Sequence, residues 1–174
     1  MNAPSAQLLV MVGEKSACVK IVGRANFTSS IDFRTLFEEL RGKGYSNFIL
    51  DLSECTLMDS TFLGVLAGFG LKMSAPNGNG AQPLQLLNPS ARITELLENL
   101  GVLHLFKIIQ CQPATAEKME ARDVTTAVPS NEEIKRTCLE AHRTLMDINP
   151  ENVSRFKDVA KFLAEDLKKL GQKN

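Results

Sequence analysis

The N-terminal two-thirds of the chain alternates between short apolar runs and stretches with apolar residues at helical spacing. Two β-rich runs at 7–12 and 17–22 flank Gly13-Glu14-Lys15, which predicts a β-hairpin. Apolar residues three and four positions apart between 30 and 41 predict a helix, and the apolar run 48–52 has the length of a buried strand. The chain is therefore expected to begin with a hairpin, a helix and a strand.

The same alternation continues to residue 109. A second helix is expected to begin at Asp59-Ser60-Thr61, followed by a strand at 83–87, a third helix at 89–100 and a last strand at 105–109. Strands that alternate with helices after an initial hairpin require parallel crossover connections. We therefore predict an α/β fold with a mixed, mostly parallel sheet of four to five strands and helices packed on it.

Polar residues mark the predicted helix starts. Ser29 or Ser30 is expected to cap the first helix, and Asn88 the third. At the second helix, the side chain of Asp59 or Ser60 can accept a hydrogen bond from a free backbone N–H group. The pattern therefore places a hydroxyl beside a carboxylate at the N-terminus of the helix that follows the central strand.

The C-terminal part has a different pattern. Residues 113–129 are polar and predict a linker, and residues 130–174 predict two helices with one apolar stripe each, separated at Asn149-Pro150. Ser130 with Glu133 three residues later forms a capping box at the start of the first of these helices. Neither helix can bury its stripe alone, so we favour packing on the domain at 1–112, or in a homodimer through this hairpin, over a free tail.

Composition excludes several classes of protein. Lys plus Arg and Asp plus Glu number 20 each, so the chain lacks the basic footprint of a protein that binds nucleic acid directly. The longest apolar run, at 63–71, has about half the length of a membrane span, which argues against membrane insertion. The N-terminal MNAPSAQ lacks the charged and apolar regions of a signal peptide, so we expect a cytoplasmic protein.

Candidate cofactor and metal sites are weak. The four cysteines contain no C-x-x-C pair, so reduced structural thiols are the default interpretation; they are Cys18, Cys55, Cys111 and Cys138. The Gly-x-Gly at 78–80 follows a helix and precedes a strand, which is the wrong order for a phosphate-binding loop. No cluster of metal-ligating residues is present in the sequence pattern, and we therefore predict neither a metal nor a cofactor.

The segments Asp51-Leu52-Ser53 and 58–66 resemble the signature of the STAS domain, the fold of bacterial anti-sigma-factor antagonists. The family pattern is roughly D-L-S followed by M-D-S-S/T-G-L-G-V-L, and the resemblance covers about residues 5–112. It implies that residues 1–112 form a STAS domain with the mixed sheet described above. The linker at 113–129 and the hairpin at 130–174 lie outside the resemblance.

The resemblance also implies a function. In this family, the serine after the aspartate is phosphorylated by a partner anti-sigma factor that is also a serine kinase, and a serine phosphatase reverses the reaction. That position is Ser60 here, with Thr61 as a secondary position and Asp59 helping to present the hydroxyl. The expected partner-binding residues are Asp59, Ser60, Thr61, Phe62, Leu63 and Gly64.

The chain departs from the family pattern at Phe62, where glycine is usual. The ring either turns into the core or lies on the surface as an apolar anchor for a partner. A glycine at this position would let the backbone of a partner approach closely. The large ring of Phe62 therefore affects which partner can bind.

Catalytic alternatives have little support in the sequence. Neither His104 nor His142 is placed near Ser60 by the pattern, so no catalytic residue is predicted. A receiver-like phosphorylated aspartate at Asp51 would need further acidic residues after the first strand to hold magnesium, and the first strand ends at Val12-Gly13. The simpler interpretation of Asp51 is a turn residue that closes the strand.

Two functions remain from the sequence. The first is a non-enzymatic anti-sigma-factor antagonist that binds its kinase when Ser60 is free and releases it when Ser60 is phosphorylated. The second is a constitutive STAS adaptor or scaffold in a signalling or transport complex, in which Ser60 only caps the helix. The two differ in whether Ser60 is modified.

Overall fold

The structure is a computed structural model that describes residues 5–74, 82–110, 120–121 and 128–173. The Gly-x-Gly at 78–80 and Cys111 lie outside the described residues.

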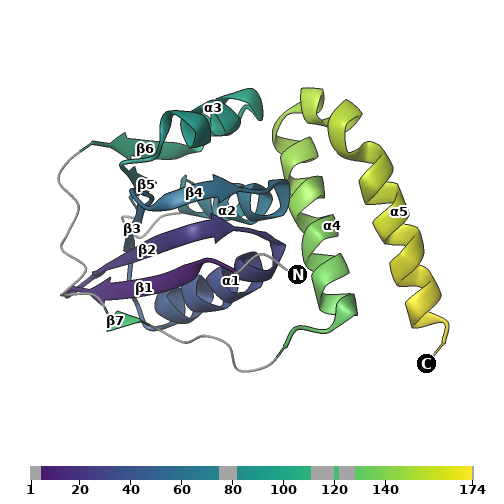
Figure 1. Cartoon of the computed structure of the whole chain (residues 1–174), viewed down its shortest axis with the longest axis horizontal. Helices are drawn as coiled ribbons and strands as arrows, with labels where there is room; N and C mark the ends of the chain where they lie inside the picture. Colours follow the sequence, from purple (N-terminus) through teal and green to yellow (C-terminus); the bar gives the residue numbers. More distant parts are fainter. Residues whose placement is uncertain (1–4, 75–81, 111–119, 122–127, 174) are drawn as a thin grey trace.

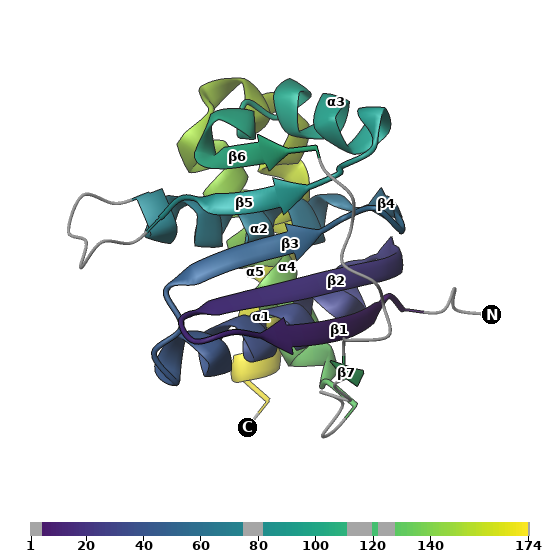
Figure 2. The same ribbon diagram turned by 90° about the vertical axis from the view of Figure 1, so that its left-hand side faces the viewer.

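A mixed sheet forms the centre of the fold (Figures 1 and 2). Its strand order is β6-β5-β3-β2-β1-β7, with β4 paired to β2 beyond the main path. The strands are β1 (Gln7–Val12), β2 (Ser16–Ala25), β3 (Asn47–Asp51), β4 (Cys55–Met58), β5 (Leu84–Leu87), β6 (Phe106–Ile109) and β7 (Glu120–Ala121). β1 runs antiparallel to β2, whereas the β2–β3, β3–β5 and β5–β6 pairs are parallel. The predicted mostly parallel mixed sheet is confirmed.

The helices lie in successive layers beside the sheet. They are α1 (Phe27–Gly42), α2 (Ser60–Ser74), α3 (Ala91–Asn99), α4 (Asn131–Ile148) and α5 (Val153–Gly171). Figure 1 shows α1 and α2 against the sheet, α4 beyond them and α5 outermost. The predicted C-terminal helices are thus present, and α4 packs on the α/β domain itself.

Two short strands were not predicted. Residues 55–58, between the predicted strand at 48–52 and the predicted second helix, form β4, which runs parallel to the distal end of β2. Glu120–Ala121, inside the predicted linker, form β7 on the open edge of β1. β7 has only two residues, too few for a period to be recognised. β4 lies between the polar pairs Ser53-Glu54 and Asp59-Ser60, which favour a turn in the sequence.

The capping residues of two helices differ from the prediction. Asn26 rather than Ser29 or Ser30 caps α1: its Oδ1 accepts from the backbone N–H of Ser29 at 3.0 Å, and Ser29 Oγ accepts from the backbone N–H of Asn26 at 2.8 Å. Ser90 rather than Asn88 caps α3, because Asn88 adopts a positive φ of 51° in the turn after β5. In both cases a neighbouring residue of equal capping propensity has the required backbone conformation.

An aromatic cluster fills the space between the sheet and the first two helices. The ring of Phe62 is fully buried, at 0% exposure, and its centroid lies 5.1 Å from that of Phe33. Phe37 stacks on Phe48 at 4.3 Å and on Phe69 at 4.1 Å. Of the two positions open to Phe62, the structure therefore has the ring in the core.

We expect Phe62→Ala to lower the free energy of unfolding by about 3–5 kcal/mol, because it removes a buried ring and leaves a cavity among its aromatic neighbours. Urea denaturation measures this change. Phe162→Ala is the matched control, because Phe162 on α5 is 64% exposed and its loss should cost about 0.5 kcal/mol or less. Equal losses in the two variants would contradict this position of Phe62.

Candidate functional site

The candidate site begins where β4 ends and α2 starts. The backbone N–H of Asp59 donates to the carbonyl oxygen of Ala25 at 3.0 Å, which ties the turn to β2. Asp59 Oδ1 accepts from the backbone N–H of Phe62 at 2.8 Å. Asp59 is therefore the residue that caps α2, and Ser60, as the first helical residue, keeps its hydroxyl for another contact.

The hydroxyl of Ser60 meets a histidine from the C-terminal hairpin. Ser60 Oγ and His142 Nε2, on α4, lie 2.9 Å apart, within hydrogen-bond distance. The sequence did not place any histidine near Ser60, because 82 positions separate these two residues. The structure thus shows that the predicted phosphorylation position is in contact with α4.

The secondary position is also covered by α4. Thr61 Oγ1 donates to Cys138 Sγ at 3.4 Å, and Thr61 is buried. Burial raises the pKa of the Cys138 thiol, with the Asp59 carboxylate acting in the same direction. Cys138 is therefore a neutral thiol at neutral pH.

One turn further along α2, the two helix backbones are in close contact. A Cβ atom built on Gly64 would lie 2.4 Å from the carbonyl oxygen of Ala141 and 2.7 Å from its Cβ atom. Only glycine at position 64 allows α4 to lie this close. The next glycine on the same side, Gly68, faces the methyl group of Thr144.

The six predicted partner-binding residues are thus divided between two environments. Asp59 caps α2, and of the other five, Ser60, Thr61 and Gly64 contact α4. Phe62 and Leu63 belong to the buried core. Whether any of the six binds a partner stays a prediction.

Burial dominates the electrostatics of the site. The pKa of His142 is lowered by burial, and the nearby Asp59 carboxylate opposes this shift. Burial raises the pKa of Asp59, whereas hydrogen bonds from the backbone at Phe62 and Phe27 oppose that shift. The imidazole also stacks on Phe156 of α5, with 4.9 Å between the ring centroids.

The Ser60–His142 pair is incomplete as a catalytic arrangement. A histidine that activates a serine is normally oriented by a third group bonded to its other ring nitrogen. His142 Nδ1 is buried and has no hydrogen-bond partner among the described residues. A buried nitrogen without a partner instead disfavours the packed position of α4, by about 1–3 kcal/mol.

Asp51 has the environment of a turn residue. Its Oδ1 accepts from the backbone N–H and the hydroxyl of Ser53, at 3.0 and 2.6 Å, and the residue is fully buried. These bonds close the turn after β3, as expected of an Asx turn.

The described ranges contain neither a metal-ligand cluster nor a helix that could span a membrane. No group of three or more metal-ligating side chains is found there. None of the helices in the same ranges is both long and apolar enough to cross a membrane.

The family model of the STAS domain matches residues 9–117. This chain belongs to the STAS domain family. The match includes the cap, Ser60 and the first turns of α2, and ends before the hairpin that carries Cys138 and His142. A search of curated proteins finds no match to this sequence.

Solved structures similar to this chain include anti-sigma factor antagonists. A candidate anti-sigma factor antagonist from Thermotoga maritima is 21% identical, with a TM-score of 0.51 over 63% of this chain and 90% of that chain. The unphosphorylated anti-sigma factor antagonist SpoIIAA is 18% identical, with a TM-score of 0.48 over 65% and 93%. The phosphorylated Bacillus cell fate determinant SpoIIAA is 18% identical, with a TM-score of 0.49 over 62% and 92%. The Thermotoga structure supports the STAS fold of this chain.

We expect the packing of α4 to weaken as the pH falls below about 6.5, because the folded state binds a proton at His142 less readily than the unfolded state. The stabilisation is complete above the unfolded pKa and is lost as the pH falls through the lower, folded pKa. The slope for one group is at most about 1.4 kcal/mol per pH unit. Urea denaturation between about pH 8 and about pH 5.5 measures it.

His142→Gln is the control for this pH dependence, because glutamine keeps a polar group near Ser60 and does not titrate. Protonation of Asp59 acts in the opposite direction, since it relieves a buried charge, and it is retained in the variant. Identical pH dependence in the parent and His142→Gln proteins would exclude the histidine as the cause.

Proposed function

We propose that this STAS protein is a non-enzymatic anti-sigma-factor antagonist that binds an anti-sigma-factor serine kinase and is switched off by phosphorylation at Ser60. The observation that carries this proposal is the position of Ser60, the first residue of α2 directly after the capping Asp59, within a matched STAS domain. The same position in the sequence resembles the phosphorylated serine of the family.

Physical chemistry supports a switch at this position. Transfer of the γ-phosphoryl group of ATP to Ser60 Oγ would release ADP and the hydroxyl proton; hydrolysis by a serine phosphatase would restore the hydroxyl and release phosphate. The phosphate adds a charge of about −1.5 to −2 beside the half-buried Asp59 carboxylate. In a partner interface that charge would be desolvated and repelled by Asp59, so binding would be lost.

A constitutive STAS adaptor is the second candidate. One observation favours it: the Ser60 hydroxyl is in contact with His142, and α4 covers Thr61 beside it. In an adaptor, Ser60 would serve only this internal contact, and the exposed surfaces would hold the other members of the complex.

We expect Ser60 to be phosphorylated to near stoichiometry when the full chain is incubated with ATP and candidate serine kinases of its host. Mass spectrometry of the digested protein locates the phosphate, and Ser60→Ala should abolish it. An unmodified protein that still captures partners would favour the adaptor over the switch.

We also expect Ser60→Asp to weaken partner binding by about tenfold or more, because a buried charge without a partner costs several kcal/mol. Pull-down and titration with the captured kinase measure the change. Ser154→Asp is the matched control, since Ser154 lies in the first turn of α5 and is exposed. If both variants hold the kinase as well as the parent, the switch at Ser60 is wrong.

A further inference from the structure

We propose that the α4–α5 hairpin is an internal competitor for the partner-binding face of α2, and that it must leave this face before a partner or a kinase engages Ser60. The inference rests on the proposed function, because it concerns access to the same serine. It assigns to residues 130–171 a regulatory role that the matched STAS segment, which ends at 117, does not contain.

The backbone of α4 blocks access to α2 near Gly64. α4 lies so close to α2 that even one added methyl group at Gly64 would lie 2.4 Å from the backbone oxygen of Ala141. No partner chain can enter between two helix backbones in contact. While α4 is seated, the stretch of α2 from Thr61 to Gly64 is therefore buried, and Ser60 beside it is half-exposed.

Side chains of α4 also contact the hydroxyl groups of Ser60 and Thr61. The Ser60 hydroxyl faces the His142 imidazole at 2.9 Å, so an incoming phosphoryl group would have to occupy the position of that ring. Thr61 is closed in the same way by Cys138. A kinase therefore needs the N-terminal half of α2 free of α4 before it can reach either hydroxyl.

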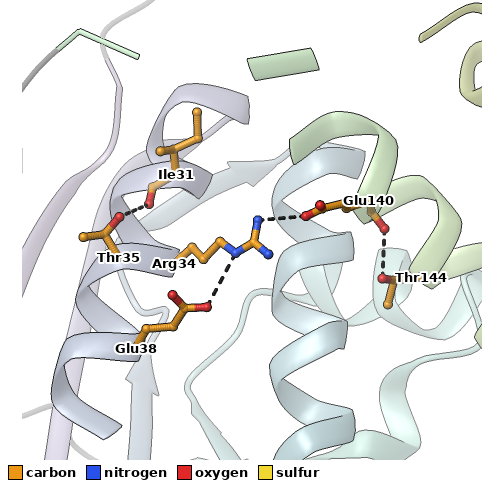
Figure 3. A network of polar contacts seen from close by, with 6 residues as sticks. All are labelled: Ile31, Arg34, Thr35, Glu38, Glu140 and Thr144. Carbon is orange, nitrogen blue, oxygen red and sulfur yellow. Dashed lines mark hydrogen bonds and ion pairs between the residues drawn. The ribbon is translucent and has the colours of Figure 1, made fainter. Parts of the chain in front are cut away.

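The contacts of α4 with α1 and with the start of α2 are few and partly open. Its contacts beside Ser60 are single polar ones, and His142 keeps a buried Nδ1 without a partner among the described residues. Toward α1, α4 is held by an ion pair between Arg34 and Glu140, 3.0 Å long and partly exposed (Figure 3). Pairs of this kind contribute little to stability. A groove of about 200 Å³ also lies between α4 and the pair α1 and α2. This side of α4 is thus incompletely packed.

The hairpin has internal contacts that can persist after it leaves. Lys135 of α4 pairs with Asp166 of α5 at 2.5 Å, and His142 stacks on Phe156. The turn between α4 and α5 positions the hairpin against the domain, because the buried Asn152 Nδ2 donates to the carbonyl oxygen of Leu100 at 2.8 Å. Leu145 adds a buried apolar contact with the core. The closed state therefore has one defined register, to which the hairpin can return.

The test uses the full chain with the substitution Ala141→Leu, which enlarges α4 at its contact with Gly64 and leaves α2 unchanged. The readout is the alkylation rate of Cys138, measured by peptide mass spectrometry, since this half-buried residue of α4 faces Thr61 of α2. We expect a rate at least about tenfold above that of the parent. Arg143→Leu, which adds the same side chain on the exposed side of α4, should leave the rate unchanged.

Two buried thiols distinguish release of the hairpin from unfolding. Cys18 and Cys55 are buried in the sheet, and burial raises the pKa of each to about 11. If the hairpin alone leaves, both stay protected while Cys138 reacts. An unchanged Cys138 rate in Ala141→Leu, or loss of protection at all three thiols together, would overturn the proposal that the hairpin separates from a folded domain.

A locked variant tests whether release is needed. Thr61→Cys would place a second sulfur beside Cys138, where the present side-chain atoms lie 3.4 Å apart, and oxidation with diamide can join the two thiols. The reduced form of the same variant is its control. We expect the kinase to modify Ser60 at least about tenfold more slowly in the oxidised form, the factor given above for release of α4.

The outcomes separate the two proposals. Equal phosphorylation of the oxidised and reduced forms would overturn the internal competitor and leave the switch at Ser60 intact. No phosphorylation of either form, with Cys138 released in Ala141→Leu, would contradict the proposed switch and support the detachable hairpin. The thiol measurement needs no partner, so the hairpin is judged in every case.

Discussion

The contact between the backbones of α2 and α4 at Gly64 and Ala141 determines how the site is arranged. Because position 64 has no side chain, α4 lies close enough for His142 to reach Ser60 and for Cys138 to reach Thr61. A larger residue at either position would separate the helices and break both polar contacts. Two hydroxyl groups of the STAS signature in this chain are therefore in contact with a helix outside the matched segment.

Two kinds of packing meet on opposite sides of α2. On the side of the sheet, Phe62 joins a dense aromatic cluster with Phe33, which fixes the helix firmly. On the side of α4, a glycine crossing, two polar pairs and an open groove lie beside the buried apolar contact of Leu145 with the core. Dense apolar packing resists separation far more than isolated polar contacts do. The proposed regulation by the hairpin depends on this difference, because the domain has to stay folded while the hairpin leaves α2.

The phenylalanine that replaces the usual family glycine at position 62 lies in the interior. Its ring is fully buried in the core, so it does not serve as an exposed apolar anchor for a partner. At the start of α2, the Asp59 side chain accepts a hydrogen bond from a backbone N–H group of the first turn. The Ser60 hydroxyl is therefore available for a different contact. In the closed structure that contact is His142, and in the proposed function it is the kinase or the phosphate.

The sequence by itself determined the order of the elements, the mostly parallel sheet and the STAS resemblance at 58–66, because apolar periodicity and local motifs are short-range properties. It also restricted the cap of α2 to two neighbouring residues. Only the tertiary structure decided that Phe62 is buried, that Asn26 and Ser90 cap their helices, and that His142 lies 2.9 Å from Ser60. The caps depend on which of several neighbouring residues has the required backbone conformation. The burial of Phe62 and the contact of His142 depend on segments far apart in the chain, and the spacing of residues along one segment contains no information about which other segment will cover it.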